Sequence, residues 1–286
     1  MLVTIIGLGL IGGSIGLALR QGKKPRWKIV GYSRRQETVA TALSLGAIER
    51  SETSLKDAVK QADFVIIATP VLTVKEIFSM IAPHLPPSCV VTDTASTKVQ
   101  VMKWAEEILP PTIDFIGGHP MAGRETYGIQ AAEAELFRRC TYCLIPSKKA
   151  SPKSIDTVTG MVKKLGAIPF FINAQKHDNL VAGISHLPML LSAALVSLTT
   201  KNSSWSNMSK LAASGYHDLT RLASGSPEVN AHICLSNKEA IVNWIDKYTQ
   251  ELERYRQLVT KGDKHLEQAL TEANKARQEW LNNLSA

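Results

Sequence analysis

A histidine in a short segment rich in glycine and proline has the composition expected of a catalytic group. Residues 117–123 read GGHPMAG and follow an apolar run typical of a strand, which places His119 in a short, stiff turn. Because the pKa of a histidine lies near neutrality, such a side chain can accept a proton from an alcohol that is being oxidised. A histidine in a turn more often has a structural role, so the segment alone leaves both interpretations open.

Polar residues also follow two other strand-like runs. DTASTK, residues 93–98, follows one apolar run, and Thr69 and Pro70 end another that covers residues 63–68. In an open parallel sheet, ligands bind beyond the carboxyl ends of the strands. We therefore expect Thr69 and Pro70 to contact the nicotinamide half of a cofactor.

A glycine motif near the start of the chain predicts a dinucleotide site. Gly7, Gly9 and Gly12 form GxGxxG between a predicted strand and a predicted helix, the context that this motif requires. The first glycine permits a tight turn, the second lets a pyrophosphate approach, and the third lets the helix pack on the strand. The whole turn, with Leu8, Leu10 and Ile11, is predicted to bind the cofactor; the alternative is a glycine turn without a ligand.

The end of the second predicted strand bears on which cofactor is bound. Ser33, Arg34 and Arg35 follow it, and no acidic residue occurs in residues 1–36. An NAD enzyme places Asp or Glu here to bind the ribose, whereas serine and arginine can bind a 2′-phosphate. The sequence favours NADP over NAD, unless the two arginines are merely solvated.

The elements that must position these residues alternate along the first part of the chain. Strand-like runs at 2–6, 27–32, 63–68 and 89–92 are separated by helix-like segments, which predicts a doubly wound, parallel α/β sheet of the Rossmann type. After Asn173 the composition becomes almost entirely that of helices. We therefore predict a dinucleotide-binding domain at residues 1–173 and a helical domain at residues 174–286.

Composition narrows the class of protein. The 286 residues carry 33 Lys and Arg against 25 Asp and Glu, but the resulting +8 charge is dispersed and forms no basic run, which disfavours a nucleic-acid partner. The apolar N-terminus has no basic flank and contains five glycines between residues 7 and 16, so we interpret it as a strand and turn of a cytoplasmic protein without a membrane anchor. Cys140 and Cys143 lack a second pair and are interpreted as buried, reduced thiols.

Five motifs resemble the prephenate and arogenate dehydrogenase family over essentially the whole chain. They are GLGLIGGS at the start, DTASTK at 93–98, GGHPMAG at 117–123, SHLP at 185–188 and GYHDLTRLASGSPE at 215–228. The resemblance implies a Rossmann domain followed by an all-helical domain that forms a homodimer. It also implies oxidative decarboxylation of a small-molecule substrate, arogenate or prephenate, in tyrosine biosynthesis, without a metal.

The resemblance assigns roles to four residues. His119 matches the histidine that accepts the proton of the ring hydroxyl, and Ser96 matches a serine that contacts the same hydroxyl. Arg221 matches the arginine that pairs with a substrate carboxylate, a role that suits its planar guanidinium. His186 matches the histidine of SHLP that lines the substrate pocket.

One departure from the family pattern bears on the substrate. Members that prefer prephenate often carry a histidine directly after SHLP, where this chain has Met189. Since arogenate replaces the ketone of prephenate with an ammonium, an apolar residue here favours arogenate, and Glu125 could bind that ammonium or instead pair with an arginine. Alternatives are a prephenate dehydrogenase using NADP or NAD, a β-hydroxyacid dehydrogenase, and a non-catalytic protein that senses NADP.

Overall fold

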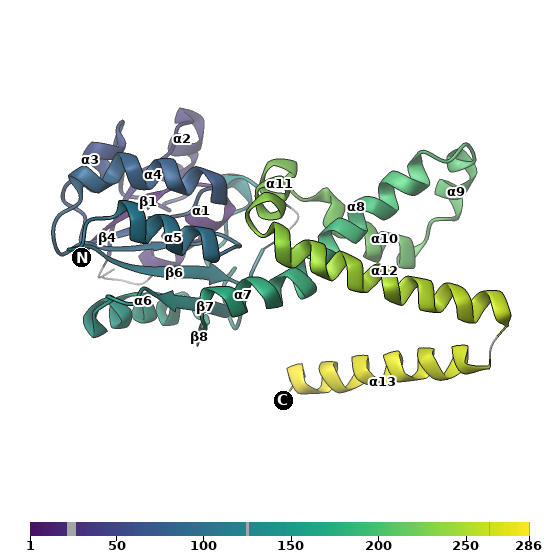
Figure 1. Cartoon of the computed structure of the whole chain (residues 1–286). Coiled ribbons are helices and arrows are strands. Elements are labelled where there is room, and N and C mark those ends of the chain that lie inside the picture. Colours follow the sequence, from purple (N-terminus) through teal and green to yellow (C-terminus); the bar gives the residue numbers. More distant parts are fainter. Residues whose placement is uncertain (22–26, 124–125, 263, 286) are drawn as a thin grey trace. The chain divides into compact units, whose positions relative to one another are not determined.

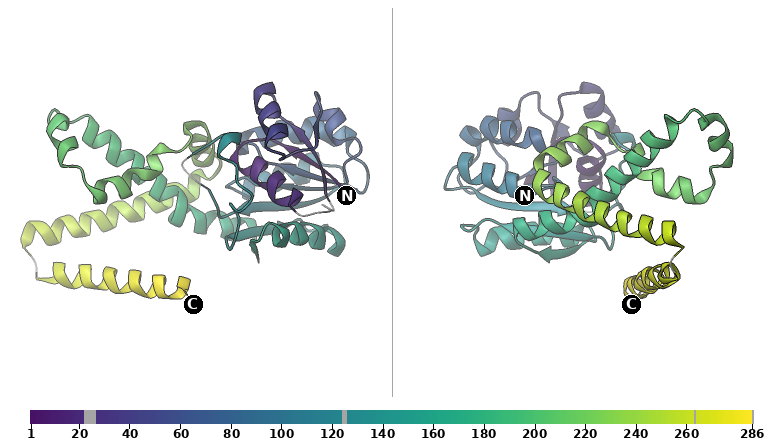
Figure 2. Two further views of the ribbon diagram at one scale, coloured as in Figure 1. Left: turned by 180° about the vertical axis from the view of Figure 1, so that it is seen from behind. Right: turned by 45° about the vertical axis from the view of Figure 1, so that its right-hand side comes forward.

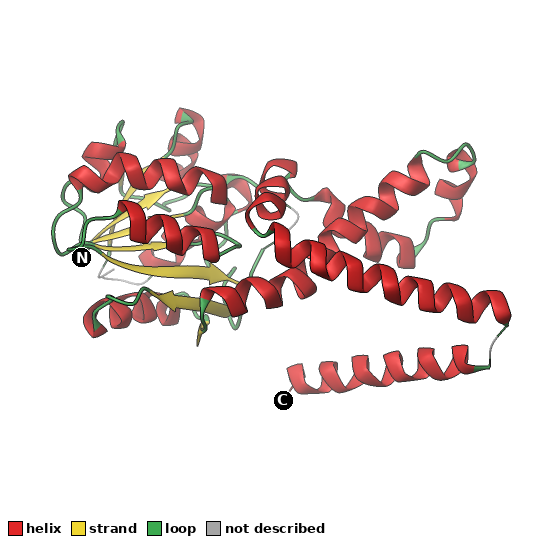
Figure 3. Cartoon of the chain, in the orientation of Figure 1, coloured by secondary structure: helices red, strands yellow, loops and turns green. Residues whose placement is uncertain are grey.

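The computed structural model describes residues 1–21, 27–123, 126–262 and 264–285. Its contacts divide the chain into two compact units, Met1–Lys238 and Glu239–Ala286, which are described separately below. The first unit contains all the strands of the described chain (Figures 1 and 3).

An eight-stranded sheet forms the centre of the first unit, in the order β3-β2-β1-β4-β5-β6-β7-β8. All neighbouring strands are parallel except β6 and β7. The strands are β1 (Leu2–Ile6), β2 (Lys28–Tyr32), β3 (Arg50–Ser51), β4 (Phe64–Ile67), β5 (Val90–Asp93), β6 (Asp114–Pro120), β7 (Thr141–Pro146) and β8 (Ile168–Phe171).

Alternating side chains of the central strands build one core on each face of the sheet. On β4, Phe64 and Ile66 join one core while Val65 and Ile67 join the other. This pattern follows from the two-residue repeat of a strand that is buried on both faces. Three helices contribute to the first core and three to the second: α1 (Leu10–Arg20), α2 (Gln36–Ser44) and α6 (Pro152–Lys164), then α3 (Leu55–Val59), α4 (Val74–Ile81) and α5 (Val99–Ile108).

The strand order reverses between β1 and β4, which creates the crevice where ligands bind in doubly wound folds. The predicted Rossmann-type fold is thus confirmed, but β7 and β8 run antiparallel to the other six strands, so the sheet is not wholly parallel. Within residues 121–140 the described structure contains only the short η3 (Ile129–Ala131) and no crossover helix. β7 therefore returns antiparallel to β6, because only parallel neighbours need a long crossover.

Helices follow the sheet in the rest of the first unit. They are α7 (Ala174–Val181), the π-helical turn η4 (Ala182–His186), α8 (Leu187–Thr200), α9 (Trp205–Leu211), α10 (Ser214–Thr220), η5 (Arg221–Ser224) and α11 (Pro227–Ser236). The stretch Ala174–Thr200 has a mean hydropathy of 1.8 and is long and apolar enough to cross a membrane by length and composition. One such helix is weak evidence for a span, because the core or interface helix of a soluble protein passes the same test.

The second unit contains α13 (His265–Ser285) and all but the first residue of α12 (Lys238–Lys261). Both are long helices between which the chain reverses direction, as the two views of Figure 2 show. The sequence predicts this helical texture from apolar residues such as Ile241 and Ile245. The domain boundary predicted after residue 173 falls just beyond β8, whereas the contacts divide the chain after Lys238, so that boundary stays a prediction.

Candidate active site

The glycine turn leaves the first helix open at its N-terminus. Gly7 has a φ of +95°, which favours glycine, and its N–H donates to the carbonyl of Tyr32 at 2.9 Å. Helix α1 begins at Leu10, and its N-cap, Gly9, has no side chain that could cap the first N–H groups. The first N–H groups of α1 can therefore bind phosphate, assisted by the helix dipole.

The second and third glycines of the motif serve different purposes. A Cβ on Gly9 would meet nothing within 4 Å, so packing within the protein does not require a glycine at this position. A Cβ on Gly12 would lie 1.9 Å from the carbonyl oxygen of Gly7, so packing excludes a side chain at that position. The open space beside Gly9 fits the pyrophosphate of a dinucleotide.

We therefore predict that two glycine substitutions affect different properties, one the affinity for the cofactor and the other the stability of the fold. Gly9→Ala should leave the melting temperature near that of the wild type but raise the Kd of the dinucleotide about tenfold or more, because its methyl group occupies the space for the pyrophosphate. Gly12→Ala should lower the melting temperature, because backbone must move. Thermal unfolding and fluorescence titration with NADP+ measure both; unchanged cofactor affinity in Gly9→Ala would place the pyrophosphate elsewhere.

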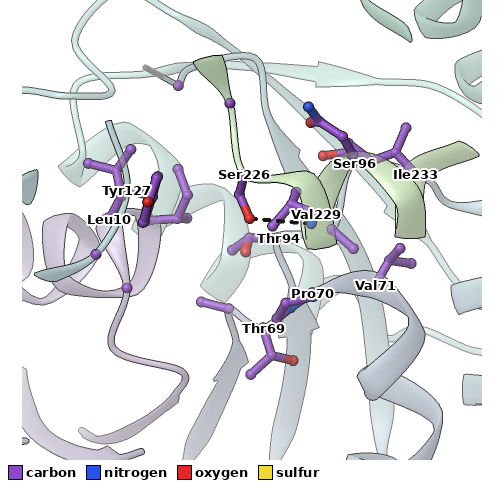
Figure 4. Close-up of a pocket in the computed structure, with 18 of the residues that line it drawn as sticks. Leu10, Thr69, Pro70, Val71, Thr94, Ser96, Tyr127, Ser226, Val229 and Ile233 are labelled. Atoms are coloured by element: carbon purple, nitrogen blue, oxygen red, sulfur yellow. Dashed lines mark hydrogen bonds between the residues drawn. The ribbon is translucent and has the colours of Figure 1, made fainter. Parts of the chain in front are cut away.

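A pocket of about 370 Å³ lies at the carboxyl edge of the sheet. In Figure 4, Ser226, Val229 and Ile233 line one side of it and Thr69, Pro70 and Val71 the other. Its remaining lining comes from Gly9, Leu10, Ile11, Ala68, Thr94, Ala95, Ser96, Ala122, Gly123, Thr126, Tyr127, Gly128, Gly225 and Asn230. Because Ser226–Ile233 lies in α11 and its N-cap, the helical segment after the sheet helps to close the crevice.

Several residues singled out in the sequence meet in this pocket. Its lining includes six of them: Gly9, Leu10, Ile11, Thr69, Pro70 and Ser96. Gly7 and Gly12 shape the turn, while Leu8 is buried in the core. Ser33, Arg34 and Arg35 directly follow β2 and do not line it; both arginines are exposed, and the Ser33 hydroxyl accepts the Arg35 N–H at 3.3 Å.

A chain of three buried side chains includes His119. His119 lies within β6, paired with Cys143 of β7, and not in the turn predicted from the sequence. It is 8% exposed and does not line the pocket, but Ala122 and Gly123 just after it do. Its Nδ1 lies 2.8 Å from Nε2 of His177, whose Nδ1 lies 2.7 Å from Oδ1 of Asp178. Burial, and to a smaller extent His177 and the cation of Lys98, hold the pKa of His119 well below 6.5, so it is neutral at physiological pH.

A fully buried ion pair fixes the two polar loops to each other. Lys98 contacts the carboxylate of Asp93 and donates to the carbonyl of Gly118 at 2.7 Å. Asp93 also accepts the N–H groups of Ala95 and Gly118, at 2.9 and 3.0 Å. DTASTK thus binds both the N–H and the carbonyl of Gly118, the residue before His119, which helps to set the position of His119.

The residues expected to bind substrate are not brought into this pocket. His186 is 1% exposed, and its Nδ1 lies 3.3 Å from Nδ2 of Asn237. Its Nε2 has no hydrogen-bond partner among the described residues, and burial lowers the pKa of His186 to about 4. Met189 is half-buried in α8, and Arg221 is exposed at the start of η5. Glu125 lies outside the described residues.

Two groups of site residues were missed in the sequence. Ser226, Val229 and Asn230 line the pocket from α11, although Ser226 followed by Pro227 is a typical start of a helix. His177 and Asp178 were also missed, since nothing local to them indicates a contact with His119. Among the residues that the structure describes, no group of three His, Cys, Asp or Glu could hold a metal, and the four cysteines are free.

The doubly wound sheet, the glycine turn and the polar strand ends define a Rossmann-type oxidoreductase. The family model for the prephenate dehydrogenase nucleotide-binding domain matches residues 15–169, and the model for the dimerization domain of the same enzymes matches residues 173–273. A prephenate dehydrogenase of Bacillus subtilis is 34% identical over 91% of this chain and 71% of its own.

Solved structures agree with these matches over nearly the full chain. Prephenate dehydrogenase from A. aeolicus, in complex with hydroxyphenyl propionate and NAD+, has a TM-score of 0.90 and 31% identity, covering 98% of each chain. Synechocystis arogenate dehydrogenase has a TM-score of 0.81 and 29% identity, covering 98% of this chain and 100% of its own. The chain belongs to the prephenate and arogenate dehydrogenase family, which confirms the resemblance seen in its motifs.

Proposed function

We propose that this enzyme oxidatively decarboxylates arogenate to tyrosine with NADP+ and that His119 is its base. The observation that carries the proposal is the buried, neutral His119 at the carboxyl edge of the sheet, next to a pocket that contains Ser96 and the glycine turn. A neutral imidazole in this place can accept the proton of the ring hydroxyl. Ser96 is proposed to hold the same hydroxyl.

The remaining assignments follow the chemistry of the substrate. When bound, the nicotinamide supplies the acceptor for the hydride that leaves the hydroxyl-bearing ring carbon. His119 takes the hydroxyl proton, and loss of carbon dioxide from the opposite ring carbon makes the ring aromatic. Arg221 is proposed to bind a substrate carboxylate, for which its guanidinium is suited, and His186 and Met189 are proposed to flank the substrate.

The preference for NADP rests on the end of β2. Arg34 and Arg35 are exposed there, form no ion pair in the described structure, and can approach a phosphate on the 2′ position of the adenosine ribose. The nearest acidic residue in sequence, Glu37, lies in the first turn of α2. A carboxylate at residues 33–35 would repel that phosphate, and none is present.

The preference for arogenate rests on Met189 and Glu125. An apolar Met189 offers no hydrogen-bond donor for the ketone of prephenate, and Glu125 is proposed as the partner of the ammonium of arogenate. Prephenate with NAD+ is the second candidate. It is favoured by the name of the B. subtilis relative and by the NAD+ bound in the A. aeolicus structure.

We further propose a cytoplasmic homodimer formed by a helical domain at residues 174–286. The match of residues 173–273 to a dimerization domain supports this, as does the apolar surface of the helices after the sheet. Ile184 and Leu198 are 72% and 74% exposed in the single chain. If these apolar side chains are buried against a second copy of the chain, the long apolar stretch needs no membrane to cover it.

Reduction of the nicotinamide, followed at 340 nm with arogenate or prephenate and with NADP+ or NAD+, tests the proposal. We expect turnover to be greatest with arogenate and NADP+. Preference for prephenate would overturn the argument from Met189, and silence in all four assays would favour a non-catalytic sensor of the cofactor.

Replacing both arginines should separate the two cofactors. Arg34→Ala with Arg35→Ala should raise the KM for NADP+ about 10- to 100-fold and leave the KM for NAD+ nearly unchanged, because only NADP+ carries the phosphate that the guanidinium groups bind. Arg50→Ala is the matched control, since Arg50 is exposed on the neighbouring strand β3 and pairs with Glu52. An equal loss with both cofactors would mean that the arginines act on the fold instead.

A further inference from the structure

The buried chain His119–His177–Asp178 links the proposed base to a carboxylate on the first helix after the sheet. His177 and Asp178 are each 1% exposed and lie in α7, 58 residues beyond His119. The rings of His119 and His177 meet edge to face, with centroids 5.1 Å apart and an interplanar angle of 72°. The arrangement therefore fixes the orientation of both rings.

The surroundings of Asp178 decide which atoms carry hydrogens. Its Oδ1 accepts the backbone N–H of Lys98 at 2.7 Å, and its Oδ2 accepts the backbone N–H of Val99 at 2.9 Å. Backbone N–H groups can only donate, so both oxygens of Asp178 act as acceptors, the arrangement that suits a carboxylate. These donors belong to the N-terminus of α5, whose dipole further favours the negative charge.

The remaining hydrogens follow from this carboxylate. Nδ1 of His177 faces Oδ1 of Asp178 and must donate, so Nε2 of a neutral His177 carries a lone pair. That lone pair accepts a hydrogen from Nδ1 of His119. Nε2 of His119, which makes no hydrogen bond with the described residues, is then the atom that keeps a free lone pair.

We propose that His177 and Asp178 are positioning residues that hold His119 as the tautomer with hydrogen on Nδ1, so that Nε2 is the atom that accepts the substrate proton. The proposal rests on the proposed function of His119 as the base. The pair is itself anchored, because Asn237 donates from Nδ2 to the backbone carbonyl of Asp178 at 2.8 Å. When the ring is held in one tautomer, no change of tautomer has to precede each turnover.

The tautomer can be observed without disturbing the chain. The full-length protein is labelled with nitrogen-15 histidine, and the imidazole signals of His119 are assigned by their loss in His119→Asn. We expect a protonated Nδ1 and an unprotonated Nε2 at neutral pH. A protonated Nε2, with Nδ1 as the acceptor, would overturn the proposal, whether or not His119 proves to be the base.

Kinetics of two His177 variants provide the second test. His177→Leu removes the acceptor and should lower kcat about 10- to 1,000-fold while changing the KM of the substrate little, since a histidine in the wrong tautomer is a poor base. His177→Gln places an amide oxygen where Nε2 lies and should restore much of that loss. His84→Leu, in η2 (Ala82–His84), is the control for removal of a histidine elsewhere.

Three outcomes distinguish this inference from the proposed function. Equal kcat for wild type and His177→Leu would overturn the positioning role. Equal losses in His177→Leu and His177→Gln, with lowered melting temperatures in both, would assign His177 to the fold and also contradict the proposal. Normal turnover of His119→Asn would instead remove His119 as the base, while the tautomer observed in the wild type would still report whether His177 sets it.

Discussion

His119→Asn is expected to lower kcat by about two to four orders of magnitude, the range typical of a lost general base. Asparagine keeps an amide N–H close to the position of Nδ1, so the 2.8 Å contact with His177 can be retained. It offers no lone pair of suitable basicity at the position of Nε2. The variant therefore removes the base and spares the packing around it.

The controls for His119→Asn are cofactor affinity and the pH profile. The Kd of NADP+ should be nearly unchanged, because His119 lies outside the glycine turn. Since burial holds the pKa of His119 well below 6.5, the neutral base persists in mildly acidic solution, and kcat/KM of the wild type should decline only below pH 6.5. Near-normal turnover of the variant would exclude His119 as the base.

Lys98→Met is expected to lower the free energy of unfolding by about 3–5 kcal/mol, as is usual when one partner of a buried ion pair is removed. The side chains of Lys98 and Asp93 are both fully buried, so the variant leaves the Asp93 carboxylate without its counter-ion. The hydrogen bond to the carbonyl of Gly118 is lost as well. Denaturant unfolding of the two proteins measures the difference.

Lys103→Met is the matched control for this prediction. Lys103 lies in α5 and pairs with Glu107 at 3.9 Å, but the two side chains are 66% and 48% exposed. Exposed pairs contribute about 0–1 kcal/mol, so this variant should be nearly as stable as the wild type. Similar stability of Lys98→Met and Lys103→Met would mean that the buried pair contributes little beyond its desolvation cost.

The predictions from the sequence were most accurate where local rules suffice. GxGxxG predicted a turn between β1 and α1, and the structure gives Gly7 a positive φ and Gly12 no room for a Cβ. Thr69 and Pro70 were expected near a ligand because they end a strand, and Ser96 was expected there from the family resemblance; all three line one pocket, and their contact with a ligand stays a prediction. Neighbouring parallel strands have their carboxyl ends at the same edge of the sheet, so residues that follow such strands lie near one another.

Contacts between distant segments could not be predicted in this way. Lys98 is a surface residue by type, yet it is fully buried because Asp93, five residues earlier, and the carbonyl of Gly118 enclose its ammonium. Val229 and Asn230 carry no signal of a ligand site and reach the pocket only because α11 packs against η1 (Val71–Thr73). The antiparallel pairing of β6 and β7 likewise depends on the path of residues 121–140.

The sequence by itself determined the class of fold and the position of the dinucleotide turn. The fold follows from the alternation of strands and helices, and the turn follows from residue types at the end of one strand. His119 was singled out by its flanking residues and by the family resemblance, and its role as the base stays a prediction. Tertiary structure alone decided what surrounds His119. The contact of His119 with His177 joins side chains 58 residues apart, and Asp178 reaches the backbone of Lys98 and Val99 across the first unit. Hydrogen bonds between such distant groups form only once packing has brought their helices and strands together, so no local pattern reveals them.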